Sequence, residues 1–382
     1  MNVAISVHPR IHRIAVSVFF FIAGLTFSSW ASRIPDIKEK LQLTEAGLGS
    51  VLFALPAGLM CSLPLSGWLV SRYGSRRIVI ISAIVYPFIL LLLASASTTF
   101  LLMTALFFFG LFANFVNIAM NTQAVGVEGL YGRSIMASFH GLWSLAGFTG
   151  AAIGTLFVSE GISPLTHFIM IWIASGFLIL ASYKSMLPSA SDVKSKQPIF
   201  VKPDKHILLL GLIAFCCMIC EGTMADWSGV YFKKVVEAPA AYITLGYVAF
   251  TATMATGRFV GDWLVTKFGV KRMLQFSATL IASGLLVAVL VPTLMMATIG
   301  FFLVGFGVSS VVPIAYGLAG KSTTMTPGMA LSAVSTIGFL GFLIGPPMIG
   351  FIAQASSLRW SFALIALLGM GTGALASRVN AR

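Results

Sequence analysis

Four ionisable side chains stand inside long apolar runs of this chain, and two of them are acids in one run. Glu221 and Asp226 both lie in the run 206–231. An ionisable group costs a few kcal/mol to place in a membrane, so it needs a partner, a water-filled space or a function. We expect Glu221 to take up and release a proton; the alternative is a permanently protonated or paired structural group. We expect Asp226 to cap a broken helix or to pair across an outer gate.

The other two ionisable groups are Arg258 and His140. Asp262 follows Arg258 by four residues, so the two share one helix face and form either an intrahelical pair or a pair that closes the cytoplasmic side. His140 begins another apolar run, where it either bonds between helices or serves as a ligand or proton relay.

A row of amides gives the main signal for a neutral ligand. Asn114, Asn117 and Asn121 recur at intervals of three and four, so they lie on one stripe of a helix. Lipid cannot satisfy amide groups, so the stripe must face protein or water. It either bonds helices together or lines a substrate site, and we favour the second. Four aromatic residues are candidates to stack on a sugar-like ring there: Trp30, Trp143, Trp227 and Tyr316.

The composition indicates which elements position these residues. Of 382 residues, 58% are hydrophobic and 9% charged, which is too little charge for a soluble surface. Spanning helices need about 20 apolar residues each. We therefore predict an all-α membrane protein with twelve transmembrane helices, at about 12–33, 46–70, 78–97, 99–123, 135–158, 163–186, 206–231, 240–265, 273–291, 294–319, 328–353 and 358–377.

The placement of the positive charge sets the orientation. Seventeen of the 24 Lys and Arg fall in alternate loops and the termini, six fall in the other loops and one lies in a span. This is the positive-inside pattern, which predicts both termini in the cytoplasm and explains the net charge of +13 without nucleic acid. The four cysteines lie in apolar runs and indicate small packing residues rather than a redox or metal site.

A repeat divides the chain into two halves. The segment 67–77, Gly-Trp-Leu-Val-Ser-Arg-Tyr-Gly-Ser-Arg-Arg, returns as Asp-Trp-Leu-Val-Thr-Lys-Phe-Gly-Val-Lys-Arg at 262–272. Between the copies lies a Ser, Pro and Lys-rich stretch at 187–205, typical of a linker. We predict two six-helix bundles in parallel repeat, 1–186 and 206–382, joined by that cytoplasmic linker.

These loops and this arrangement resemble the major facilitator superfamily over essentially the whole chain. The residues that match its 2–3 loop motif are Gly67, Leu69, Arg72, Gly74, Arg76 and Arg77, while Ser71 and Thr266 replace the usual acid. The resemblance implies a loop that latches the gate, through Arg72, Arg76, Arg77 and, in the second copy, Lys267, with Asp262 as a substitute acid.

Finer features look like the fucose-permease-like branch: 257–261 (Gly-Arg-Phe-Val-Gly), 221–228 and 345–350. In that permease, proton coupling is assigned to acids in spans 1 and 4. Here the matching span-4 position is Asn117 and the span-1 position is near Ala31, so that mechanism does not transfer.

The expected function is secondary transport of a small polar solute, a sugar or sugar-like compound first, by alternating access and driven by protons or by the solute's own gradient. The alternative is proton-driven export of apolar or cationic drugs; a non-transporting sensor or scaffold is a third class. We expect a monomer in the bacterial inner membrane, without enzymatic activity, cofactor or metal, whose partners are its substrate, protons and lipid.

Overall fold

The computed structural model describes residues 9–131, 135–188, 203–322, 324–325 and 327–379, which fold into helices joined by short turns. A few side chains inside these ranges, among them that of Asp262, lie outside the description. The first half contains α1 (Pro9–Ser32), α2 (Ile34–Lys40), α3 (Glu45–Leu52), α4 (Ala54–Tyr73), α5 (Ser75–Ser95), α6 (Thr99–Tyr131), α7 (Met136–Ser159), α8 (Pro164–Ser182) and η1 (Tyr183–Ser185). The second contains α9 (Lys205–Lys234), η2 (Ala240–Tyr242), α10 (Leu245–Phe268), α11 (Val270–Leu290), α12 (Leu294–Val308), α13 (Val311–Ala319), α14 (Pro327–Ala355) and α15 (Leu358–Ala376).

Eleven helical segments of the described residues are long and apolar enough to cross a membrane. The predicted span at 240–265 corresponds to α10, which is not among the eleven. Arg258 and several threonines interrupt its apolar run. Because α10 packs between α7, α9 and α12 along its length, it completes the predicted twelve spans.

Two of the spans are broken, each at the same distance before a proline. The first break separates α3 from α4 at Phe53, three residues before Pro56. The second separates α12 from α13 at 309–310, and Pro313 follows Ser310 by three residues. Proline lacks the N–H that would bond to the carbonyl four residues earlier, and its ring clashes there, so the helix changes direction. Span 2 therefore bends at this position.

The two copies of the sequence repeat make the same turn. Gly74 has φ 84° and Gly269 has φ 81°. The N–H of Gly74 donates to Val70 O at 2.9 Å, and that of Gly269 to Val265 O at 2.8 Å. A side chain at such a positive φ is strained, so glycine is required where one helix stops and the next begins at once.

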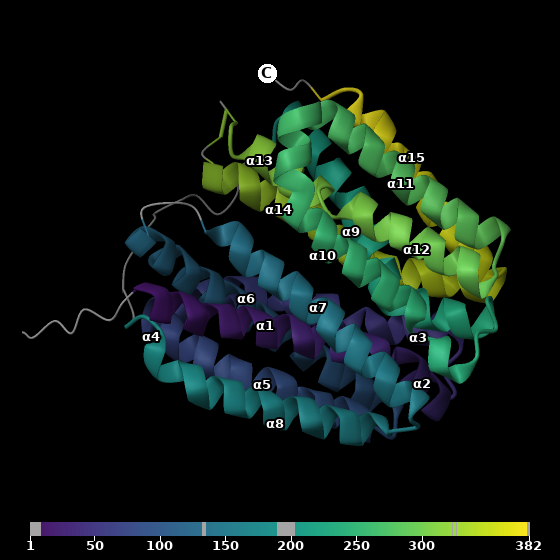
Figure 1. The fold of residues 1–382 in the computed structure, drawn as a ribbon, viewed down its shortest axis with the longest axis horizontal. Helices are drawn as coiled ribbons and strands as arrows, with labels where there is room; N and C mark the ends of the chain where they lie inside the picture. Colours follow the sequence, from purple (N-terminus) through teal and green to yellow (C-terminus); the bar gives the residue numbers. More distant parts are fainter. Residues whose placement is uncertain (1–8, 132–134, 189–202, 323, 326, 380–382) are drawn as a thin grey trace, which may run out of the picture.

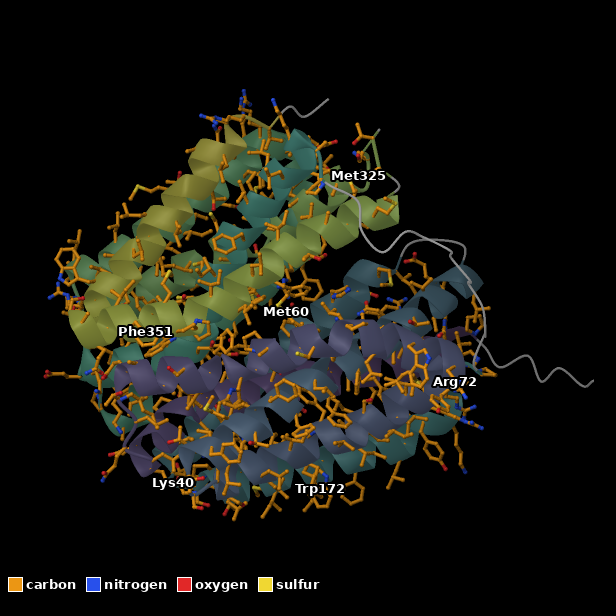
Figure 2. The ribbon with its side chains drawn as sticks, turned by 180° about the vertical axis from the view of Figure 1, so that it is seen from behind. Lys40, Met60, Arg72, Trp172, Met325 and Phe351 are labelled. Atoms are coloured by element: carbon orange, nitrogen blue, oxygen red, sulfur yellow. The ribbon has the colours of Figure 1, made fainter. Side chains whose placement is uncertain are left out.

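Helices α1–α8 pack mainly on one another, and α9–α15 do the same, so the molecule has two halves (Figure 1). Figure 1 shows the halves meeting around α2 and α3 and lying apart at the opposite end. We name these the closed end, which carries α2, α3 and η2, and the linker end, which carries Gly74, Leu187 and Gly269. Figure 2 shows Lys40 and Phe351 at the closed end, and Arg72 and Met325 apart on the two halves at the linker end.

Candidate functional site

The closed end is held by charges from both halves. Lys233 donates to Glu39, and Lys234 donates to Glu45, in two inter-half ion pairs. Lys38 lies 3.5 Å from the same Glu45 carboxylate. The hydrogen bond from Lys233 and its positive charge hold the pKa of Glu39 below the usual range of a glutamate. We call Lys233, Lys234, Glu39 and Glu45 the charge clamp.

Glycines bring the backbones of the two halves together beside this clamp. A Cβ atom built on Gly49 of α3 would lie 2.5 Å from the carbonyl oxygen of Pro346 and 3.0 Å from the Cα of Gly350, both on α14. One built on Gly350 would lie 2.5 Å from the carbonyl oxygen of Glu45. The crossing of α3 and α14 therefore depends on missing side chains, as in other close helix contacts in membranes.

Arg258 of α10 joins the halves further along the molecule. Its Nη2 lies 3.5 Å from Glu221 Oε1 on α9, in its own half. Its Nη1 donates to Ser144 Oγ of α7, in the first half, at 2.7 Å. The guanidinium also lies 5.5 Å from the centre of the Trp143 ring, a cation–π contact. We call Arg258, Glu221, Ser144 and Trp143 the central cluster.

The central cluster is partly accessible in spite of its depth in the spans. The side chain of Arg258 is 22% exposed and that of Glu221 is 17% exposed. Arg258 and Glu221 pair with each other, and Arg258 also reaches α7 of the other half. Inside a span, such a pair supplies each charged group with a partner.

Two neutral hydrogen bonds also cross between the halves. The hydroxyls of Ser28 on α1 and Tyr247 on α10 are 3.0 Å apart. Thr244 donates to Thr155 Oγ1 of α7 at 2.6 Å. The contact between α7 and α10 thus extends from the closed end to Arg258.

The structure corrects part of what the sequence predicts for Asp226. Helix α9 runs unbroken from Lys205 to Lys234, so Asp226 caps no broken helix. It is half-buried, and none of the ion pairs between the described residues includes it. Lys233 and Lys234, the cations at the end of the same helix, pair with Glu39 and Glu45 instead. The predicted partner of Arg258, Asp262, lies outside the described side chains, and Arg258 pairs with Glu221.

The asparagine row divides into two parts. Asn114 is 3% exposed and donates to Ser62 Oγ at 2.8 Å and Ser66 Oγ at 3.3 Å, both on α4. It therefore bonds α6 to α4, and its predicted place in a substrate site is wrong for this structure. Asn117 and Asn121 are half-buried, and Asn121 Nδ2 donates to Asn117 Oδ1 at 2.9 Å. These two amides remain candidates for a ligand.

The predicted aromatic residues also separate. Trp30 is 1% exposed, and its ring centre lies 6.4 Å from that of Phe109 within the first half, so it belongs to the core and not to a ligand site. Trp227 is also fully buried, so its predicted place at a ligand is wrong for this structure as well. Trp143 and Tyr316 are half-buried, and Trp143 lies in the central cluster. His140 is exposed one turn before Ser144, whose hydroxyl donates to the His140 carbonyl oxygen at 3.1 Å.

The basic residues of the repeated loop stay within their own halves. Arg72 stacks on Trp68 and Tyr73, and Lys267 on Trp263 and Phe268. Arg76 donates to the carbonyl oxygens of Tyr183 and Lys184 in η1, and Arg77 is exposed. Among the described residues, the contacts found for these cations lie within their own halves, so their gating role stays a prediction for another conformation.

Sequence reasoning missed the charge clamp and the glycine crossing. The signal for the clamp was present, since Lys233 and Lys234 are two adjacent cations on the side that the positive-inside pattern leaves poor in cations. Gly350 ends the segment 345–350 that resembles a known branch, but nothing in the sequence pairs it with Gly49 among 37 glycines. The described residues contain no group of three or more His, Cys, Asp or Glu that could hold a metal ion.

Comparison with known proteins shows which protein family has this sequence and fold. The sequence model of the Major Facilitator Superfamily matches residues 16–254 and 210–379. The chain is 36% identical to an uncharacterised MFS-type transporter of Yersinia pestis, over 98% of both chains. It is 31% identical to the membrane protein MosC of Rhizobium meliloti, over 93% of this chain and 87% of that one.

Its fold is similar to that of a bacterial homologue of the human lysosomal transporter Spinster, solved in an inward-facing and occupied conformation. The TM-score is 0.75 at 13% identity, over 97% of both chains. The chain belongs to the Major Facilitator Superfamily and is an all-α, multi-pass membrane protein of that transporter family.

Proposed function

We propose that this protein carries a small polar solute across the bacterial inner membrane by alternating access, with protons as the coupling ion. The observation that carries the proposal is Arg258, which bonds its own half through Glu221 and the other half through Ser144 and Trp143. A residue placed in this way transmits a change at one carboxyl group to the contact between the halves.

The two ends of the molecule supply the two gates. The charge clamp and the crossing of Gly49 with Gly350 close one end, which the distribution of Lys and Arg assigns to the outer face. At the linker end, assigned to the cytoplasm with both termini, Arg72 of the first half and Met325 of the second half lie apart (Figure 2). We propose that residues 1–186 and 206–382 rock about the central cluster, and that the cations of the repeated loop close the linker end in the opposite state.

The proposed ligand is a neutral hydroxylated compound, with sugars first. Asn117 and Asn121 supply amide donors and acceptors, and Trp143 and Tyr316 supply faces for a ring. His140, exposed near the linker end, is the proposed residue at the entrance. Arg258 is already occupied by Glu221, so the cluster carries no free acid to attract a cation, and this disfavours export of cationic drugs.

The proposed coupling step is the protonation of Glu221. A proton on this carboxyl group neutralises it, which weakens its bond to Arg258 and changes what Arg258 offers to Ser144 and to the ligand. Release of the proton on the other side restores the pair. Asp226 has no ion pair among the described residues. It is proposed as a second acid on the same helix as Glu221, nearer to the closed end.

The experiment is a flux measurement in proteoliposomes. Purified protein is first screened by thermal shift against neutral monosaccharides and polyols, and the stabilising compound is then used in radiolabelled form. With an imposed pH gradient, the wild type accumulates the compound and acidifies or alkalinises the lumen, as read by a trapped pH dye.

Glu221→Gln is expected to lose gradient-driven accumulation and proton movement while it keeps exchange between equal pools. Glu160→Gln, an exposed acid in the turn after α7, is the matched control and should behave as the wild type. Normal accumulation in Glu221→Gln removes the coupling role from this residue. Absence of flux for every stabilising compound contradicts the transport proposal itself.

A further inference from the structure

A groove between α1, α6, α7 and α8 of the first half lies apart from the central cluster. It has a volume of about 720 Å³, which is within the range of small-molecule sites. Its floor is the exposed face of α1, formed by Ile14, Ser17, Val18 and Phe21. Leu142 of α7 and Leu178 of α8 are its walls, so this part of the lining is apolar apart from Ser17.

The groove exists because the two halves of the repeat differ. Helices α14 and α15 of the second half pack against each other and cover α9. Their counterparts in the first half, α7 and α8, are not in close contact along the described residues. Helix α1 therefore remains accessible between them, although 72% of its most apolar stretch is buried. Ile14, in this gap, is 63% exposed.

One end of the groove is positively charged. Arg10 and Arg13 line it at the linker end, together with Tyr131. Arg13 lies over the Tyr131 ring at 5.5 Å and donates to Ser138 Oγ at 3.2 Å, which fixes its guanidinium at the mouth of the groove. The Tyr131 hydroxyl is buried and has no hydrogen-bond partner in the structure as described. This mouth offers guanidinium donors to an anion.

The dimensions match one leaflet of a bilayer. From Arg13 to Phe21 a helix rises about 12 Å, which is less than half of a hydrocarbon core of about 30 Å. A ligand for this groove is thus anionic at the level of the first turns of α1 and apolar toward the membrane centre. A sugar or an ion alone leaves the apolar part unused, whereas a phospholipid uses both.

We propose that this groove binds one anionic phospholipid, with its phosphate on Arg10 and Arg13 and an acyl chain along α1 between α7 and α8. Basic pockets between transmembrane helices on the cytoplasmic side recognise anionic headgroups by this chemistry. The lipid fills the space that α15 and α14 close in the second half, so it stabilises the packing of α8 on α1. The site is independent of the proposed transport path.

The test uses the full-length protein in detergent, with its thermal unfolding followed during titration with phosphatidylglycerol, phosphatidylcholine or inorganic phosphate. Phosphatidylglycerol is expected to raise the unfolding temperature in a saturable way, and phosphatidylcholine to act only at much higher concentration. The double variant Arg10→Gln and Arg13→Gln should need about 30-fold more phosphatidylglycerol, since each cation near the surface contributes about a kcal/mol.

Two further variants separate the groove from general charge attraction. Lys271→Gln with Arg272→Gln removes the same charge from the linker end of the other half, where both residues are exposed, and should leave the titration unchanged. Ile14→Trp fills the groove without altering charge and should abolish the saturable effect. Equal losses in the two double variants, equal stabilisation by phosphatidylcholine, or a full effect of inorganic phosphate each overturn the proposal.

Discussion

Replacement of Gly49 by valine tests the proposed closing of the outer end. The Cβ of any side chain at this position would lie 2.5 Å from the carbonyl oxygen of Pro346, whereas ordinary contacts begin at 3.4 Å. The neighbouring atoms are backbone atoms of α14 and cannot rotate away, so α3 and α14 must separate by roughly 1 Å, the difference between these distances. Valine adds two methyl groups to this overlap.

The size of the effect follows from the cost of overpacking. Forcing an extra group into a packed contact costs about 1–3 kcal/mol, which corresponds to a change of about 5–150-fold in a two-state equilibrium. That cost falls on the conformation in which the outer end is closed. It is absent when the halves separate there, so the variant should populate the outward-open state far more than the wild type does.

The assay measures the distance between the halves at the closed end. Spin labels at Ser97 and Ser356, in exposed turns of the two halves, are placed in a background where exposed Cys61 is serine. Gly49→Val should shift the distance distribution by pulsed electron resonance toward longer values. Gly176→Val is the control, because a Cβ at Gly176 of α8 meets no atom within 4 Å. A distribution for Gly49→Val that equals the wild type or the control refutes this account of closure.

Three other predictions follow from the same contacts. Asn114→Ala should lower the free energy of unfolding by about 1 kcal/mol, as for other buried polar contacts between membrane helices; thermal unfolding measures this loss. Asn117→Ala should lower transport, measured as flux, without a loss of stability. Lys233 lowers the pKa of Glu39, so their bond should persist as pH falls and break only below the ordinary glutamate pKa of about 4.3. Opening of the closed end above this pH, measured with the spin labels, contradicts the prediction. Gly74→Ala places a side chain at φ 84° and should destabilise the turn by about 1–2 kcal/mol, measured by thermal unfolding.

The spans and the repeat could be predicted because they depend on properties local in the chain. Each span is an apolar run long enough for the bilayer, and each of the two turns at Gly74 and Gly269 needs a glycine whatever surrounds it. The breaks before Pro56 and Pro313 have the same local cause, the missing proline N–H. The family's loop motif is one contiguous segment, 67–77, so it could be recognised without knowledge of any contact.

The candidate site depends on rotations and distances that the sequence does not contain. Asn114 and Asn117 are three residues apart, about 60° short of a full helical turn, and this angle puts one against α4 and leaves the other half-buried. The sequence likewise does not show which way Trp30 points. In the structure its ring lies against Phe109, so it belongs to the core.

Partners distant in the chain set a further limit. The spacing along α10 predicts Asp262 as a partner of Arg258, and the side chain of Asp262 lies outside the description. The fold also brings Glu221 to Arg258, from 37 residues away in the chain. The sequence by itself determined that this is a gene-doubled bundle of membrane helices with costly polar groups. Only the packing of the two halves decided which of those groups meet, because an ion pair or a glycine crossing forms between surfaces whose register is set by all the helices together.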